Sequence, residues 1–177
     1  MKTPSFQIES VTEEHIAGFN HAVDLVARER KYLARTEAPS LAESEAFVRD
    51  NIRNGNPHFV AVCSGEIVGW CDIVRMKKEV FSHCGALGMG VVAGYRRQGI
   101  GLALIRAALA GAKAIGLERV ELEVYHTNTS AIALYEKVGF HTEGVKARSA
   151  KLAGTYLDML QMALFLDACK DPAEHER

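Results

Sequence analysis

The sequence has no excess charge of either sign, and it has no long apolar run. Its 177 residues include 21 Lys and Arg and 22 Asp and Glu, which gives a formal net charge of −1. A chain without net positive charge has no global field that attracts nucleic acid or anionic lipid, so we expect neither a nucleic acid nor a membrane as partner. No run of about 18 apolar residues occurs, so we also expect no transmembrane helix. The net charge does not exclude a local anion-binding site, because it is only the sum of all charges in the chain.

Cysteine is sparse, and the thiols are not spaced for metal binding. Cys63, Cys71, Cys84 and Cys169 form no CxxC pair and no zinc-ligand spacing. The N-terminal stretch "MKTPSFQIESVTEEHIAGF" has no continuous apolar segment after its lysine, so no signal peptide is indicated. We therefore expect a cytoplasmic protein with reduced thiols and no metal site.

The apolar content and its periodicity indicate one folded domain. Hydrophobic residues make up 48% of the chain, which is typical of a globular protein with a core. We expect a single domain over residues 1–168 and a polar C-terminal tail over 169–177. The pattern predicts, in order, strand 6–12, helices after Thr12 and after Ser40, strands 58–63, 66–76 and 85–92, a helix from 99 to about 116, strand 119–126, helix 130–139, and strands 140–150 and 155–166. This order indicates an α/β fold with a mixed sheet.

The helix after Ser40 has the clearest start signal. Ser40 is a capping residue, and Glu43 lies at the capping-box position three residues later. We expect its apolar side to consist of Leu41, Phe47, Val48 and Ile52.

The segment "YRRQGIGLAL", residues 95–104, places two glycines at the start of an apolar helix. A helix N-terminus presents unpaired N–H groups and the positive end of the helix dipole, and it binds phosphate. Gly99 and Gly101 carry no side chain that would keep a phosphate from these amides. Arg96 and Arg97 add positive charge. The segment therefore favours a diphosphate site over an ordinary glycine-rich turn.

Two familiar phosphate loops do not fit. A P-loop needs a Lys-Ser/Thr pair after its second glycine, and here Leu102 and Ala103 follow Gly101. The dinucleotide fingerprint GxGxxG is broken at Leu104. ATP or NAD binding is therefore disfavoured.

Two blocks of the sequence resemble the GNAT superfamily of acetyl-CoA-dependent N-acyltransferases. "RRQGIG" is similar to the Arg/Gln-x-x-Gly-x-Gly/Ala signature, with Arg96, Gly99 and Gly101 in the signature positions. "LEVYHTNTSAIALYEKVGF" is similar to the second block, in which an Asn precedes a short helix that carries Ala-x-x-Leu-Tyr and ends in Gly-Phe. The similarity is strong over about residues 88–140 and weaker over Phe59–Leu166. It implies an α/β fold of the α+β type, with a mixed, mostly antiparallel sheet flanked by helices.

The resemblance implies acetyl-CoA as the co-substrate. Its diphosphate would rest on the backbone amides of the glycine loop, and the strand "MGVV" would pair with the pantetheine arm as with an added strand. Gly88 and Gly90 would then give room for the arm, although a bulge is an alternative reason for glycine there. The implied cofactor-binding residues are Met89, Gly90, Val91, Arg96, Arg97, Gln98, Gly99, Ile100, Gly101, Leu102, Asn128 and Tyr135.

Two residues of the second block have both a functional and a structural interpretation. Asn128 corresponds to the family asparagine that contacts the cofactor, and it can equally cap the helix that follows. The resemblance implies that Tyr135 is the general acid for the departing thiolate. The alternative is a half-buried aromatic residue with a satisfied hydroxyl.

The base and the acceptor pocket are less specified. Glu121 and Glu123 alternate along one strand and face the same side. The family uses a glutamate at the Glu123 position in some members and water in others. Asp72 lies in the apolar strand "IVGWCDIV", which favours an ammonium partner unless the strand meets solvent there. Tyr32 is a candidate for lining an acceptor pocket.

The sequence therefore predicts an N-acetyltransferase that moves an acetyl group to a primary amine by direct attack on the thioester. The acceptor is a small amine, an amino-acid-like molecule or a protein N-terminus. The alternative is a CoA-binding regulatory module without turnover, which would need neither Tyr135 nor a base. The last strands often mediate dimers in this family, so a homodimer is also open.

Overall fold

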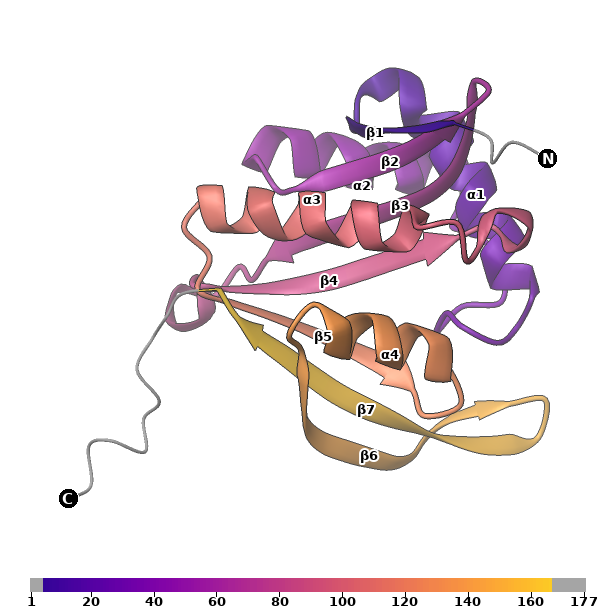
Figure 1. Ribbon diagram of the computed structural model, residues 1–177, viewed down its shortest axis with the longest axis vertical. Coiled ribbons are helices and arrows are strands. Elements are labelled where there is room, and N and C mark those ends of the chain that lie inside the picture. Colours follow the sequence, from indigo (N-terminus) through magenta and orange to yellow (C-terminus); the bar gives the residue numbers. More distant parts are fainter. Residues whose placement is uncertain (1–4, 167–177) are drawn as a thin grey trace.

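The computed structural model describes residues 5–166, and they form a seven-stranded sheet with helices on both faces (Figure 1). The strands lie in the order β1-β2-β3-β4-β5-β7-β6. Their bounds are β1 Phe6–Ser10, β2 His58–Cys63, β3 Glu66–Arg75, β4 Cys84–Val91, β5 Arg119–Tyr125, β6 His141–Leu152 and β7 Thr155–Phe165. The main helices are α1 Ile16–Arg28, α2 Leu41–Asn54, α3 Ile100–Ala114 and α4 Thr129–Lys137, and short 3₁₀ turns cover Glu13–His15, Glu79–Phe81 and Ala93–Tyr95.

The element order and the sheet type are as predicted. Only β4 and β5 pair in parallel, and the other neighbours pair antiparallel. The sheet is therefore mixed and mostly antiparallel, which confirms the expected fold class. The expected tail over 169–177 and Cys169 lie outside the described residues.

The parallel pair of strands separates soon after it begins. β4 and β5 are paired at Cys84–Arg119, Gly85–Val120 and Ala86–Glu121, and the register has no further partners beyond that point. Figure 1 shows the two strands diverging from this shared start. We call the region between Leu87–Val91 of β4 and Leu122–Tyr125 of β5 the β4–β5 split.

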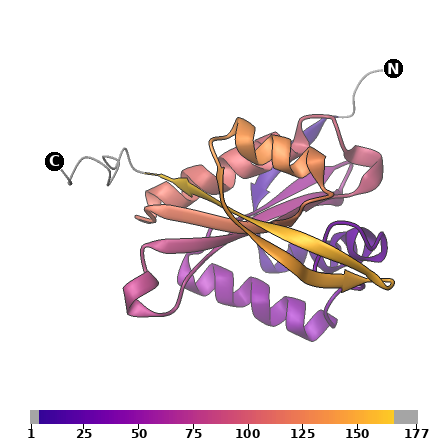
Figure 2. The same ribbon diagram turned by 90° about the horizontal axis from the view of Figure 1, so that it is seen from below.

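Each face of the sheet carries its own hydrophobic cluster. Figure 2 shows α3 and α4 on one side of the sheet and α1 and α2 on the other. The α3–α4 face buries an aliphatic set that includes Ile100, Leu104, Val120 and Leu122. The α1–α2 face buries Ile16, Phe19, Val23 and Val26 of α1 together with Trp70 of β3.

The capping prediction for α2 is confirmed, but its predicted apolar side is wrong. Ser40 accepts a hydrogen bond from the Glu43 amide, and the Glu43 carboxylate accepts one from the Ser40 amide at 2.8 Å. Of the four apolar residues expected to be buried, Val48 is buried, whereas Leu41, Phe47 and Ile52 are exposed. The helix instead buries Ser44 and Asn51, and both are hydrogen-bonded, Ser44 by Asn20 at 2.9 Å and Asn51 by Asn56 at 3.1 Å. Apolar periodicity cannot find a buried face that is made of paired polar side chains.

Candidate active site

The β4–β5 split exposes backbone in the middle of the sheet. β4 is flanked by β3 and β5, yet Ala86 is exposed and Leu87–Val91 are partly exposed. Along Leu87–Val91, the backbone groups on the β5 side have no strand partner among residues 5–166. Such unpaired groups can accept an extended ligand that carries amides, as a sheet edge does.

The glycine loop lies directly after β4 and leads into α3. Arg97 and Gly99 have left-handed backbone conformations, with φ of 62° and 86°, and Gln98 between them does not. Alternation of this kind turns successive amides toward one side and makes an anion-binding concavity. α3 starts at Ile100, and its first backbone bond runs from the Ala103 amide to the Gly99 carbonyl at 3.0 Å. The amides of the predicted residues Gly99, Ile100, Gly101 and Leu102 are therefore not used within the helix.

Close packing accounts for the second glycine of the loop. A Cβ on Gly101 would lie 3.2 Å from Leu134 of α4 and 3.6 Å from the methyl group of Met89 on β4. The start of α3 therefore lies against both α4 and the split. The structure brings the predicted residues Met89, Gly101 and Leu102 into one region.

Arg96 differs from the rest of the loop. Its Nε donates to the Val91 carbonyl at 2.7 Å, and its two terminal nitrogens donate to the two carboxylate oxygens of Glu29. The guanidinium also lies 4.5 Å from the ring centre of Tyr32. The side chain of this predicted cofactor residue is thus directed to the segment after α1, together with the predicted substrate residue Tyr32.

Gly88 and Gly90 face neighbouring side chains of β3. A Cβ on Gly90 would lie 2.3 Å from the Trp70 ring, and a Cβ on Gly88 would lie 3.4 Å from both carboxylate oxygens of Asp72. The register between β3 and β4 is continuous, so the bulge alternative is wrong. Close approach is the reason for glycine, and the group that approaches Gly90 is the indole of Trp70.

The second sequence block places a capped helix and a buried phenol beside the split. The Asn128 side chain accepts a hydrogen bond from the Ala131 amide at 3.3 Å, so the capping interpretation of Asn128 is present. Tyr135 is 7% exposed, and its ring lies 5.8 Å from that of Phe140. Burial raises the pKa of the Tyr135 phenol, and the nearby Cys71 adds to this effect.

The two candidate bases on β5 are both in ion pairs. Glu121 accepts a hydrogen bond from Arg119 at 3.3 Å, and Glu123 pairs with Lys146 of β6. Both carboxylates are accessible, with side-chain exposures of 39% for Glu121 and 40% for Glu123.

Asp72 is buried, so the alternative that its strand meets solvent there is wrong. It is 7% exposed, and its cross-strand partner is His58, which is 3% exposed. Burial raises the pKa of the Asp72 carboxyl to about 7 and lowers the pKa of the His58 imidazole to about 4. Asn51 contacts His58 Nδ1 at 3.3 Å, and within residues 5–166 His58 Nε2 has no partner.

The sequence does not indicate the pairing of Glu29 with Arg96 or the position of His58. Glu29 lies in a run of mixed charges, and its pairing with Arg96 joins positions 67 residues apart. His58 opens a strand that reads as apolar, and no local pattern marks its long-range partners. Only the fold brings these residues to the site.

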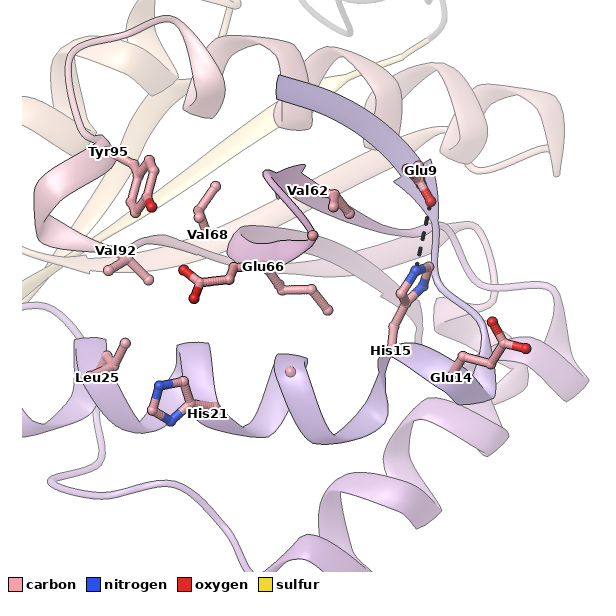
Figure 3. Close-up of a pocket in the computed structure, with 13 residues that line it drawn as sticks. Glu9, Glu14, His15, His21, Leu25, Val62, Glu66, Val68, Val92 and Tyr95 are labelled. Carbon is pink, nitrogen blue, oxygen red and sulfur yellow. Dashed lines mark ion pairs between the residues drawn. The ribbon is translucent and has the colours of Figure 1, made fainter. Parts of the chain in front are cut away.

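A pocket of about 410 Å³ lies between α1 and the β2–β3 hairpin, apart from the predicted residues (Figure 3). It contains an ion pair between His15 and Glu9 at 3.7 Å, and His21, Glu66 and Tyr95 also line it. None of the predicted cofactor or catalytic residues contributes to it. No group of three or more His, Cys, Asp or Glu in the described part of the chain is placed to hold a metal ion. No helix over residues 5–166 is both long and apolar enough to cross a membrane.

The fold is that of known acetyltransferases. The structure of YncA, a putative acetyltransferase from Salmonella typhimurium solved with acetyl-CoA, superposes with a TM-score of 0.87 and 17% identity, and the match covers 94% of this chain and 97% of that one. The acetyltransferase (GNAT) family model matches residues 22–140, so the chain belongs to the GNAT family.

Named relatives have the corresponding enzymatic activity. The L-amino acid N-acetyltransferase AaaT of Escherichia coli K12 is 31% identical over 112 residues, which is 63% of this chain and 69% of that protein. The N-alpha-acetyltransferase RimI of Mycobacterium tuberculosis is 33% identical over 135 residues, which is 69% of this chain and 84% of that protein. The chain is therefore an acyltransferase of the GNAT type.

Proposed function

We propose that this enzyme transfers the acetyl group of acetyl-CoA to a primary amine by direct attack on the thioester. The observation that carries the proposal is the junction of the β4–β5 split with the start of α3. An unpaired strand edge over Leu87–Val91 leads into a loop with four amides that α3 does not use. The edge suits the amides of pantetheine, and the loop suits the diphosphate.

The donor would lie along predicted residues in two groups. Met89, Gly90 and Val91 would pair with pantetheine, and the loop from Arg97 to Leu102 would hold the diphosphate. Asn128 would contact the cofactor while it caps α4, because its carboxamide carries a donor nitrogen beside the oxygen that accepts from Ala131. Arg96 would contribute through its position in the chain, since its side chain is bonded to Glu29.

The reaction needs an acid and a base on the two sides of the thioester. The amine nitrogen attacks the carbonyl carbon, the carbon–sulfur bond breaks, and the sulfur leaves as a thiolate. Tyr135 would donate its phenolic proton to that sulfur, and its raised pKa means that the phenol carries this proton at neutral pH. Glu123 is our first candidate for the base that takes the amine proton, directly or through water, and Glu121 is the second.

The acceptor would enter between the segment after α1 and the β6–β7 hairpin. The names of the relatives cover free L-amino acids and protein N-termini, which share a primary amine. Tyr32 lies in the segment after α1. Asp72 lies on β3 opposite Gly88 of β4, and its carboxylate faces that glycine. Both remain candidates for substrate contacts, Tyr32 for the acceptor's apolar part and Asp72 for its ammonium group.

The test is amine-dependent release of the CoA thiol across two panels, one of free amino acids and one of short peptides with free N-termini. We expect thiol release with members of one panel and a matching mass gain of one acetyl group on the acceptor. A protein that binds acetyl-CoA but releases no thiol with any amine would support the regulatory module instead. Stronger competition by ATP or NAD than by CoA would favour a nucleotide site and contradict the proposal.

A further inference from the structure

The side chain of Arg96 links the end of β4 to the segment over residues 29–39. We call this segment the α1–α2 segment. Its Nε is bonded to the Val91 carbonyl at the end of β4, and its other nitrogens hold both oxygens of Glu29. Tyr32 covers the guanidinium face at 4.5 Å. The side chains of Arg96 and Glu29 are only 27% and 24% exposed, so the pair is partly desolvated.

The same segment is fixed at two other places. The Tyr125 hydroxyl at the end of β5 donates to the Leu33 carbonyl at 3.4 Å. At the far end, Asp24 accepts from the Ala38 amide at 3.0 Å, and Asn20 donates to the Pro39 carbonyl at 2.8 Å. The contacts at residues 38 and 39 hold the segment to α1, whereas those at Glu29 and Leu33 hold it to the sheet.

The two sheet contacts lie on opposite sides of the split. Val91 ends β4 and Tyr125 ends β5, and these parallel strands have their carboxyl ends at the same edge of the sheet. The α1–α2 segment therefore passes across the open end of the β4–β5 split, on the side of the strand arrowheads in Figure 1. Within the segment, Arg30, Lys31 and Arg35 are exposed to solvent.

We propose that Arg96 is a positioning residue for the acceptor, because it fixes the α1–α2 segment across the mouth of the donor site. This inference rests on the proposed function, since it assigns the segment to the acceptor. Arginine suits the role because its planar fork binds a carboxylate through two parallel bonds while Nε bonds a third group, which a lysine cannot do. The guanidinium also stacks on Tyr32, which adds a contact that depends on its planar shape. The Arg96 side chain would therefore fix the acceptor site next to Val91 and the glycine loop, where the acetyl donor would bind.

Limited trypsin digestion tests the positioning role without any turnover. The α1–α2 segment has cleavage sites after Arg30, Lys31 and Arg35, and cleavage requires the segment to leave the surface. We expect Arg96→Gln and Glu29→Gln each to speed the appearance of fragments that begin at residues 31, 32 and 36 by about tenfold, as for loss of a charge-assisted pair. The double variant should be no faster than the faster single variant, because both changes remove one interaction.

A matched control is Arg49→Gln. Arg49 bonds Glu13 at 2.9 Å and pairs with Glu45, away from the segment, so its loss should leave cleavage unchanged. Equal cleavage rates in Arg96→Gln and the wild-type protein would overturn the proposal, as would additive effects in the double variant.

Kinetics then separate the acceptor from the donor. With an amine found in the panels above, Arg96→Gln should raise the acceptor KM about tenfold and change the acetyl-CoA Kd, measured by calorimetry, by less than about twofold. A rise in the acetyl-CoA Kd that equals the rise in the acceptor KM would show that Arg96 serves the donor and would overturn the proposal. If no amine is acetylated, the proposed function fails, while the trypsin result still decides whether Arg96 fixes the segment.

Discussion

The two faces of the sheet are built in different ways. The α3–α4 face is an aliphatic core with local signals along the chain, namely a glycine loop, a capped helix and a motif tyrosine. The α1–α2 face also buries the polar residues Ser44, Asn51, Asn56, His58 and Asp72, and Ser44 accepts a hydrogen bond from Asn20, which lies 24 positions away on another helix. The α3–α4 face can therefore be read from short motifs, whereas the polar contacts of the α1–α2 face join residues of different elements. The predictions below change one face at a time.

The largest effect is expected at Tyr135 on the α3–α4 face. Tyr135→Phe removes only the hydroxyl, so the core packing against Phe140 stays. We expect kcat to fall about 100-fold or more, the usual size of a general-acid contribution, with the acetyl-CoA KM nearly unchanged. Steady-state kinetics over a range of pH values measure this. An unchanged kcat at every pH would remove Tyr135 from the mechanism.

The next effect concerns the buried pair on the α1–α2 face. Asp72 has a pKa raised to about 7, so the native state holds a proton that the unfolded state lacks, and stability falls as pH rises between about 4 and 7. His58 has a pKa lowered to about 4, so the unfolded state holds the extra proton, and stability rises between about 4 and 6.5. Each slope is about 1.4 kcal/mol per pH unit, and in the wild-type protein the two oppose each other.

Asp72→Asn removes the contribution of Asp72 to the pH dependence of the free energy of unfolding. The free energy of unfolding of the variant, relative to wild type, should rise by about 3 kcal/mol from pH 4 to 6.5. Urea titrations at several pH values give this difference, and other titrating groups cancel because both proteins share them. A difference that does not change with pH would mean that Asp72 is charged in the native state.

Gly90 tests the packing of β4 against Trp70 of the α1–α2 face. A Cβ there would lie 2.3 Å from the Trp70 ring, so Gly90→Ala forces β4 or the indole to move. We expect a loss of about 2 kcal/mol in the free energy of unfolding, as is typical of overpacking. Gly94→Ala is the control, because a Cβ at Gly94 has no atom within 4 Å. Equal stability of the two variants would contradict the packing described for Trp70.

Glu123 on β5 is expected to give the smallest effect. Glu123→Gln should lower kcat/KM for the acceptor about tenfold at neutral pH, because the base is lost and water takes part of its role. Lys146→Met breaks the same ion pair and keeps the carboxylate, so it should retain activity. If the two variants lose activity equally, the ion pair matters and Glu123 is not the base, which would leave Glu121 or water.

The difference between the faces also explains how much could be predicted from the sequence. Apolar periodicity and turn residues were sufficient for the seven strands and the four α-helices of residues 5–166, and the element order indicated a mixed sheet. The resemblance added that the sheet is mostly antiparallel. The Ser40–Glu43 box and the Asn128 cap were predictable because each joins residues three apart. The polar buried side of α2 was not, because Asn51 is paired through the fold and not through the helix.

In the candidate active site too, local features could be predicted from the sequence and contacts between distant residues could not. In the loop from Arg97 to Leu102, Gly99 occupies a left-handed backbone conformation that favours glycine. The direction of the Arg96 side chain was not predictable, because Glu29 lies 67 residues earlier. Nor could the sequence tell whether Asp72 is buried, since strand ends and strand centres share the same alternation. The role of a residue whose partner is distant in the sequence can be assigned only from the structure.

The most direct test of the account is to follow the backbone amide signals of the protein by NMR as acetyl-CoA is added. We expect the largest shifts at Gly99, Ile100, Gly101 and Leu102 and along Leu87–Val91, and smaller shifts at His15 and His21 in the pocket of Figure 3. The largest shifts in that pocket, or none at the start of α3, would contradict the claim that the β4–β5 split and its loop hold the acetyl donor.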